Sequence, residues 1–375
     1  MRKGTARVFF IYDAYFCFVL QSIEDFNVRD KFAFVCPYYD RSICIIFTGL
    51  LGISLAYMGF GVWALVFQDV GGAIMVCILT IYVSRWFPRA RFSWDSFKKL
   101  FGYGSKILGS SLINTIYSNL YTLVIGRVFS ASQVGYYNRA NGYAYLPAGT
   151  ISDMTLRVNF PILATIQDDN ERLLSAYRKL MSVPLYVLYP MLIGIAVLAE
   201  PLIIVMIGEK WLPCAHMMQI LCIGYMFSPL THLNLNLLYV KGRTDLVLKL
   251  ELIKKPIAFI ILFASIPFGI MWMVVGKAIY EFIAFSCNCY YTGKILGYGE
   301  WDQLKELIPI FLNSCIMGGI VLAITQPLDN AWLKLLVGIP TGVIAYLLYS
   351  IITKDNNFLE LKRILCERLS KFKQR

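Results

Sequence analysis

The amino-acid sequence predicts an all-α, polytopic integral membrane protein with about ten transmembrane helices, and three observations lead to this prediction. The 375 residues are 58% hydrophobic, and their mean hydropathy is +0.61. Only 15% of them are charged, whereas about 25% is typical of a soluble domain. The apolar residues form long continuous runs separated by short basic patches, which is typical of membrane-spanning helices and not of the alternating strands of a β-barrel.

Residues 1–42 do not follow the pattern of the rest of the chain. Their apolar run is only about 13 residues long, carries Asp13 and is followed by a highly charged segment. From residue 43 onward, apolar runs of spanning length recur regularly. We expect spans at about residues 43–59, 62–84, 105–127, 133–156, 176–199, 215–240, 246–268, 269–292, 308–326 and 331–353.

Two of these spans are more polar than simple anchorage requires. Within the stretch 92–128, a basic amphipathic run leads into a helix that carries small and polar residues, among them Asn114. Such a helix is suited to pack closely on its neighbours and to face an aqueous cavity. The span 133–156 is the most polar and contains Pro147. We interpret it as a bent span that faces a cavity, with a soluble loop as the alternative.

The Lys and Arg residues are distributed unequally over the two ends of the predicted spans. If the loop 85–106 is cytoplasmic, the cytoplasmic segments after residue 84 and the span ends that adjoin them collect 24 Lys and Arg residues, against 4 on the other side. This bias follows the positive-inside rule and predicts a cytoplasmic C-terminus. We expect the tail 354–375 to be a basic amphipathic helix on anionic lipid, with a solvated tail as the alternative.

The composition gives no indication of an enzyme, a cofactor or a nucleic-acid partner. The formal net charge of +12 is explained by the basic loops. The ten cysteines are scattered without a C-x-x-C pair, and the two histidines lack ligand spacing, so we expect reduced thiols and no metal site. Common hydrolase, metalloprotease and nucleotide-binding motifs are missing. The Asp168-Asp169 pair resembles the D-D of metal-dependent glycosyl or prenyl transferases, but the start of a helix explains it equally well.

Ionisable residues inside the predicted spans are the strongest functional signal, because each costs at least about 2.5 kcal/mol at the bilayer centre and normally faces a cavity or a partner. Arg139 lies early in the span 133–156, and Arg127 ends the span 105–127. Lys277 and Glu281 lie mid-span, four residues apart and on one helix face. For Arg127 the alternative is interfacial anchoring, and for Lys277 and Glu281 it is a neutralising ion pair.

A third group lies on the span 246–268, where Lys254 and Lys255 follow Glu251 within one turn. Their alternative role is to snorkel to the headgroups. Because cations outnumber anions in the spans, we expect a cationic cavity that binds an anionic phosphate or pyrophosphate headgroup. Asparagines and tyrosines that could bind sugars, or could simply join helices, are Asn114, Asn119, Asn138, Asn141, Asn234, Asn236, Tyr117, Tyr121, Tyr137 and Tyr143.

An ordered series of short segments resembles the polysaccharide-transporter branch of the multidrug/oligosaccharidyl-lipid/polysaccharide flippase superfamily, and most closely its Wzx-type O-antigen and capsule flippases. The segments are LAYMGFGVWALVFQ (55–68), FGYGSK (101–106), VIGRVFS (124–130), VGYYNR (134–139), NFPIL (159–163), GEKW (208–211) and VKGRTDL (240–246). These segments run from residue 55 to residue 246 in the order expected for the family, and the resemblance as a whole covers about residues 43–310.

The resemblance implies two helix bundles around a central cavity that opens alternately to the two sides. It implies a substrate, an undecaprenyl-pyrophosphate-linked oligosaccharide, that moves across the bacterial inner membrane. Family members use cationic cavity residues for the pyrophosphate, and the resemblance carries this role over to Arg139 and Lys277. From their residue type and their position in the spans, the further candidate headgroup-binding residues are Glu281, Lys254, Lys255, Arg127, Asn114 and Asn138. Membrane lipids and other polysaccharide assembly proteins are the further partners implied.

Family members usually have twelve to fourteen spans, so the resemblance also implies an N-terminally truncated chain. We expect an atypical segment at 1–42, the remnant of an N-terminal bundle at 43–91, a six-helix C-terminal bundle at 92–298, an extra helix pair at 299–353 and the basic tail at 354–375. Two other functions remain open. A drug or cation antiporter predicts an acidic cavity, and a polysaccharide polymerase or ligase predicts a large charged outer loop.

Overall fold

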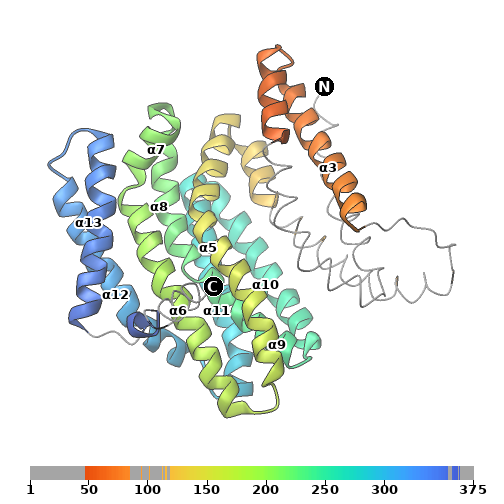
Figure 1. Ribbon diagram of the computed structural model, residues 1–375, viewed down its shortest axis with the longest axis vertical. Helices are drawn as coiled ribbons and strands as arrows, with labels where there is room; N and C mark the ends of the chain where they lie inside the picture. Colours follow the sequence, from red (N-terminus) through yellow and green to blue (C-terminus); the bar gives the residue numbers. More distant parts are fainter. Residues whose placement is uncertain are drawn as a thin grey trace. The chain divides into compact units, whose positions relative to one another are not determined.

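The computed structural model describes residues 47–84, 94, 101, 112, 115, 119–353, 357–361 and 363. The regular structure of these residues is entirely helical, as Figure 1 shows, which confirms the all-α prediction. The chain divides into two compact units, Met1–Ile116 and Tyr117–Arg375. Each unit is described by itself below. The finer domain boundaries expected at residues 42, 91, 298 and 353 stay predictions.

The first unit contains a helical hairpin made of residues 47–57 and α3 (Val62–Ser84), at the positions of the predicted spans 43–59 and 62–84. The turn between the helices uses Gly59 and Gly61, whose φ angles of 85° and 53° suit glycine. A Cβ on Gly52 would come within 2.4 Å of the side-chain amide oxygen of Gln68 on α3. The glycine therefore leaves room for the Gln68 side chain between the two helices.

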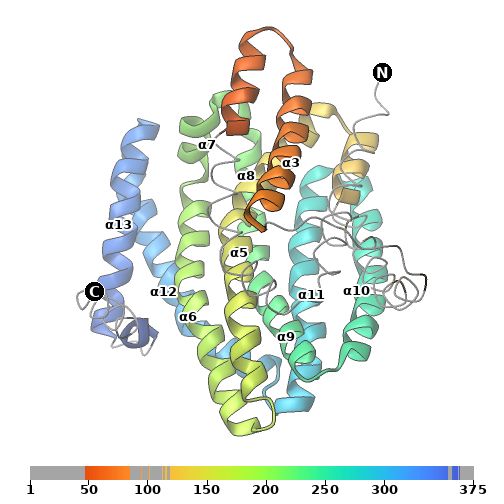
Figure 2. The ribbon, with the colours of Figure 1, turned by 45° about the vertical axis from the view of Figure 1, so that its right-hand side comes forward.

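The second unit is a helical bundle, seen from two directions in Figures 1 and 2. Residues 119–128 are helical and lead into it. Its elements are α5 (Ala131–Thr165), α6 (Asn170–Val197), α7 (Ala199–Ile207), the 3₁₀ turn η1 (Glu209–Trp211), α8 (Pro213–Tyr225), α9 (Ser228–Val240), α10 (Thr244–Ser265), η2 (Ile266–Phe268), α11 (Ile270–Leu296), α12 (Glu300–Thr325) and α13 (Ala331–Ile352).

Local signals in the sequence explain where several of these helices begin. Ser130 and Gln133 form a capping box at the start of α5. Asp169 caps α6 by accepting a hydrogen bond from the backbone N–H of Arg172 at 3.1 Å, so the helix-start interpretation of the Asp168-Asp169 pair is confirmed. The Asn330 side chain accepts from the backbone N–H of Trp332 at 2.9 Å and caps α13.

Helix α5 contains the polar stretch for which a loop was the alternative. Its 35 residues correspond to a length of roughly 52 Å. Ala140, Ala144 and Ala148, spaced four residues apart, are all completely buried, and α5 packs on both α8 and α9. The loop alternative is therefore wrong, because one face of this polar segment carries a stripe of small residues that buries against two other helices.

The predicted span 215–240 is two helices and not one. Helix α8 ends at Tyr225 and α9 begins at Ser228. Pro229 explains the break, because proline has no N–H to donate to the carbonyl four residues earlier, and its ring would clash with that carbonyl. The carbonyl in question belongs to Tyr225, the last residue of α8. Continuous hydrophobicity hid this break in the sequence.

Among the described helices, α6, α11, α12 and α13 are long and apolar enough to cross a membrane. Helices α8 and α9 have 13 residues each, or about 20 Å. Each is shorter than the membrane is thick, and only the two together, one following the other, reach membrane thickness. The total of about ten spans stays a prediction. Helices α6 and α12 also begin earlier than the spans predicted within them, at Asn170 and Glu300.

One close contact in the bundle core fixes the position of α11. A Cβ added to Gly224, near the end of α8, would lie 2.7 Å from the Cα of Ala278 on α11. A side chain would therefore push the two helices apart. This contact brings the end of α8 against the middle of α11, where Lys277 lies.

Candidate functional site

Lys277 is held by a group of aromatic and amide side chains from three other helical segments. Its ammonium donates a hydrogen bond to the hydroxyl of Tyr137 at 3.1 Å and to Oδ1 of Asn141 at 2.5 Å. The rings of Tyr121, Tyr137 and Tyr225 have their centroids 5.3–5.6 Å from the same ammonium. We call Tyr121, Tyr137, Asn141 and Tyr225 the tyrosine clasp.

The clasp is itself well ordered by contacts between its members. The Tyr225 hydroxyl donates to Oδ1 of Asn141 at 2.6 Å, and the rings of Tyr121 and Tyr137 are stacked with centroids 6.2 Å apart. Tyr137 and Asn141 are four residues apart on α5 and so share a helix face. Cation–π contacts contribute about 0.5–2 kcal/mol each, so the clasp offsets much of the cost of burying an ammonium.

Glu281 lies one turn further along α11, but it does not pair with Lys277. In the described part of the chain, no ion pair or hydrogen bond involves the Glu281 carboxylate, although it lies close enough to Lys277, Lys254 and Lys255 to interact with their charges. The predicted alternative, a neutralising ion pair within α11, is therefore not formed in this conformation. Both residues are partly buried.

A second charged cluster lies on α10. Glu251 forms ion pairs with Lys254 at 2.6 Å and with Lys255 at 3.4 Å. The Lys254 side chain is only 3% exposed, and that of Lys255 is 14% exposed. The snorkelling alternative is wrong for Lys254, because a buried ammonium that is paired with a carboxylate on its own helix does not extend to the headgroups.

The structure does not bring Arg139 together with Lys277. Tyr137 and Asn141 point toward Lys277, and Arg139 lies about 200° around α5 from Tyr137. The Arg139 side chain is exposed, and its guanidinium lies 5.9 Å from the ring centroid of Trp211 in η1. Trp211 lies in the turn between α7 and α8, at the same end of the bundle as the start of α5. A shared Arg139–Lys277 pocket is therefore not present in this conformation.

The other predicted residues are dispersed. Arg127 is exposed at the end of the helical segment 119–128. Asn138 is exposed, and its Oδ1 accepts a hydrogen bond from the Thr122 hydroxyl at 3.1 Å. Asn114 lies outside the described residues. The structure thus gathers Lys277, Glu281, Lys254 and Lys255 into one region of the bundle and leaves Arg139, Arg127 and Asn138 outside it.

Sequence analysis named Asn234 as a residue that could join helices, but it did not predict the buried polar network that this side chain forms at the other end of the second unit. The amides of Asn234 on α9 and Gln303 on α12 exchange two hydrogen bonds of 3.1 and 3.2 Å, and the Tyr177 hydroxyl donates to Asn234 at 2.9 Å. Gln303 is completely buried. Asn234 and Gln303 are 69 residues apart, and no local pattern in the sequence predicts that their amides will be in contact.

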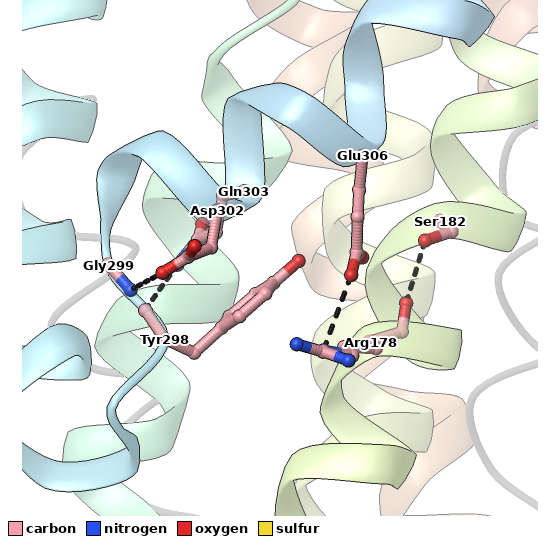
Figure 3. A network of polar contacts seen from close by, with 7 residues as sticks. All are labelled: Arg178, Ser182, Tyr298, Gly299, Asp302, Gln303 and Glu306. Carbon is pink, nitrogen blue, oxygen red and sulfur yellow. Dashed lines mark hydrogen bonds and ion pairs between the residues drawn. The ribbon is translucent and has the colours of Figure 1, made fainter.

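Figure 3 shows the outer part of this network, where α6 meets α12. Arg178 forms an ion pair with Glu306 at 3.3 Å and places its guanidinium 4.8 Å from the Tyr298 ring centroid. The Tyr298 carbonyl lies 3.5 Å from the Gln303 amide nitrogen. The network therefore ties α6, α9 and α12 together at the end of the bundle where the basic turns lie.

The fold and the charged groups within its helices define a polytopic helical membrane protein. Residues 14–216, more than half of the chain, match the family described as polysaccharide biosynthesis protein. The chain belongs to that family, which confirms the resemblance found in the sequence.

Several curated proteins are similar to the chain. It is 25% identical over 272 residues to the teichuronic acid biosynthesis protein TuaB of Bacillus subtilis, covering 71% of this chain and 56% of TuaB. It is 29% identical over 263 residues to the lipopolysaccharide biosynthesis protein WzxC of Escherichia coli, covering 70% of this chain and 49% of WzxC. The chain thus spans about half the length of these relatives.

A solved structure has the same fold. The lipid II flippase MurJ in its inward closed conformation superposes with a TM-score of 0.63 at 16% identity, covering 85% of this chain and 68% of MurJ. The likeness confirms the fold class predicted from the sequence.

Proposed function

We propose that this protein takes part in the translocation of an undecaprenyl-pyrophosphate-linked oligosaccharide across the bacterial inner membrane, without enzymatic chemistry. The observation that carries the proposal is the group of three lysines within the helices of a MurJ-like fold. Cations in membrane-spanning helices are costly and normally face a cavity or a partner. The names of the relatives, which include the succinoglycan biosynthesis transport protein ExoT of Rhizobium meliloti, support a polysaccharide precursor as the substrate.

The proposed site is the region around Lys277, Lys254 and Lys255. An ammonium binds a phosphate oxygen through a charge-assisted hydrogen bond. Each lysine already has partners in this conformation: neutral groups in the tyrosine clasp for Lys277, and Glu251 for the other two. The headgroup would therefore compete most easily for Lys277, because no carboxylate is paired with it. Arg139 and Arg127 lie near a membrane end, where they would meet the headgroup on entry or exit.

Orientation is part of the proposal. We place the turns α5–α6, α9–α10 and α11–α12 in the cytoplasm. They lie at one end of the unit, since the Lys241 ammonium donates to Asn170 at 2.9 Å and Arg178 contacts Tyr298. Several basic residues gather at this end: Arg172, Arg178, Lys179, Lys241, Arg243 and Lys294. A reporter fused to the C-terminus that is active only in the cytoplasm should be active, and an inactive reporter would reverse the orientation.

The function is tested by complementing a flippase-null strain and measuring surface glycan. Wild type should restore the glycan, and Lys277→Ala should lower the rate roughly tenfold or more, because a charge-assisted hydrogen bond is worth about 1.5–3 kcal/mol. Lys249→Ala, which removes an exposed lysine on α10, is the matched control and should behave as wild type. Full membrane insertion of wild type without any glycan would refute the proposal for this chain.

A further inference from the structure

Glu281 differs from the lysines around it. Each of those lysines has a hydrogen-bond or ion-pair partner, whereas Glu281 has none among the described residues. Lys277 is four residues away on the same face of α11, the spacing at which a lysine and a glutamate pair, yet its ammonium is turned to Tyr137 and Asn141. Lys254 and Lys255 are held by Glu251. Within the described residues, nothing donates a hydrogen bond to the partly buried Glu281 carboxylate.

An ionised carboxylate in that position is costly, because burial removes its hydration and no hydrogen bond or ion pair replaces it. Binding one proton removes the charge. The neighbouring ammonium groups do not relieve the cost as long as each is turned to another partner. The neutral, protonated carboxyl is therefore the form that fits this conformation.

The charged and titratable groups closest to Glu281 lie on α5, α8, α10 and α11, and further ones lie on α9 and α12. The cations whose charge interacts with it are Lys277 on α11 and Lys254 and Lys255 on α10. The neutral tyrosine hydroxyls that its charge affects are Tyr280 on α11, Tyr137 and Tyr145 on α5, and Tyr225 on α8. On α9, His232 interacts with Lys254, Glu251 and Asp153. On α12, Glu300 accepts a hydrogen bond from the Ser286 hydroxyl at 2.7 Å. None of these groups is a carboxylate that shares a proton with Glu281.

We propose that Glu281 binds a proton while Lys277 lies in the tyrosine clasp, and releases that proton to water when Lys277 leaves the clasp and pairs with it. Lys277 stays an ammonium throughout. The only bond broken is the O–H bond of the Glu281 carboxyl, and the only bonds exchanged are hydrogen bonds. One proton is bound or released for each change of partner.

The exchange has a structural consequence, because the clasp joins the segment 119–128, α5 and α8 to α11. When Lys277 leaves, Asn141 retains its bond from Tyr225, but both lose their polar contact with α11, while the packing of α8 on α11 at Gly224 remains. Proton binding at Glu281 would then favour the joined state of these helices. If the chain translocates a lipid-linked oligosaccharide as proposed above, the joined and released states would differ in their access to the substrate; only this last step rests on the proposed function.

The proton site is tested by pH-difference infrared spectroscopy of the full chain in lipid nanodiscs. Wild type should show the C=O band of a protonated carboxylic acid near neutral pH, and Glu281→Gln should lack it. Glu306→Gln, which removes a carboxylate already paired with Arg178, should retain it. Asn141→Leu, which weakens the clasp and frees Lys277 for Glu281, should also lose the band while Glu281 is still present.

The outcomes separate the two proposals. A wild-type spectrum without a carboxylic acid band near neutral pH, or a band that persists in Glu281→Gln, overturns the proton site whatever the chain transports. If Glu281→Gln does not fold, the loss or persistence of the band in Asn141→Leu decides the matter. A band that behaves as expected in a chain that fails to restore surface glycan leaves the proton site standing and refutes the transport proposal alone.

Discussion

The ion pairs on α10 allow a prediction whose size follows from the structure. Replacing Glu251 by Gln removes the one carboxylate that two lysines share, at 2.6 and 3.4 Å. Lys254, with its side chain only 3% exposed, is then left as a buried ammonium without its carboxylate. Breaking a buried pair from one side costs about 3–5 kcal/mol. We expect Glu251→Gln to lower the free energy of unfolding of the second unit by that amount.

Removing the other partner should cost much less. In Lys254→Met the Glu251 carboxylate retains Lys255, and a buried charge is replaced by an apolar side chain of similar length, so the change should stay within about 1 kcal/mol of wild type. Glu306→Gln breaks an ion pair whose side chains are 48% and 33% exposed, and it should also cost no more than about 1 kcal/mol.

Unfolding with a denaturing detergent, followed by circular dichroism, measures all three variants under one condition. If the reasoning is right, the free energy of unfolding of Glu251→Gln lies far below those of Lys254→Met and Glu306→Gln. Equal losses for Glu251→Gln and Lys254→Met would show that packing and not charge dominates on α10, and would refute the argument. A free energy of unfolding for Glu251→Gln equal to that of wild type would show that water reaches the Lys254 ammonium.

Three further predictions concern other parts of the second unit. Gly224→Leu should destabilise it by several kcal/mol and lower the yield of folded protein from membranes, because the new side chain meets the backbone of α11. Gln303→Leu should cost about 1–3 kcal/mol in the same unfolding assay, since the Asn234 amide loses its partner; a neutral effect would mean that water replaces it. The guanidinium of Arg243 hydrogen-bonds Asp245 and lowers the pKa of that carboxyl. Arg243→Ala should raise this pKa toward its ordinary value in a carboxyl NMR titration, so that the pair's small contribution to stability, present at neutral pH and lost in acid, disappears.

Charges within the helices were the most informative feature of the sequence, and the structure sorts them into two kinds. Lys277, Glu281, Lys254 and Lys255 were all recognised from their position in apolar runs, and they do lie in one region. Arg139 was recognised by the same rule, yet it stacks beside Trp211. Hydropathy shows whether a charged residue lies within an apolar run of the sequence, but it does not show in which direction the side chain points.

The sequence by itself determined the class of the protein, its family and the approximate positions of many helices. Run length, composition and capping residues such as Ser130 and Asp169 act over a few neighbouring residues, so that they can be recognised without knowing the fold. Even the break at Tyr225 has a local cause in Pro229, which the continuous hydrophobicity concealed.

Only the tertiary structure decided which groups become partners. Lys277 meets Asn141 across 136 residues of sequence instead of Glu281 four residues away, and Asn234 meets Gln303 across 69. These choices depend on how closely α8 and α11 approach at Gly224 and on which face α5 presents to them. Helix packing sets both, and a hydrogen bond that spans only about 3 Å depends on small differences in that packing.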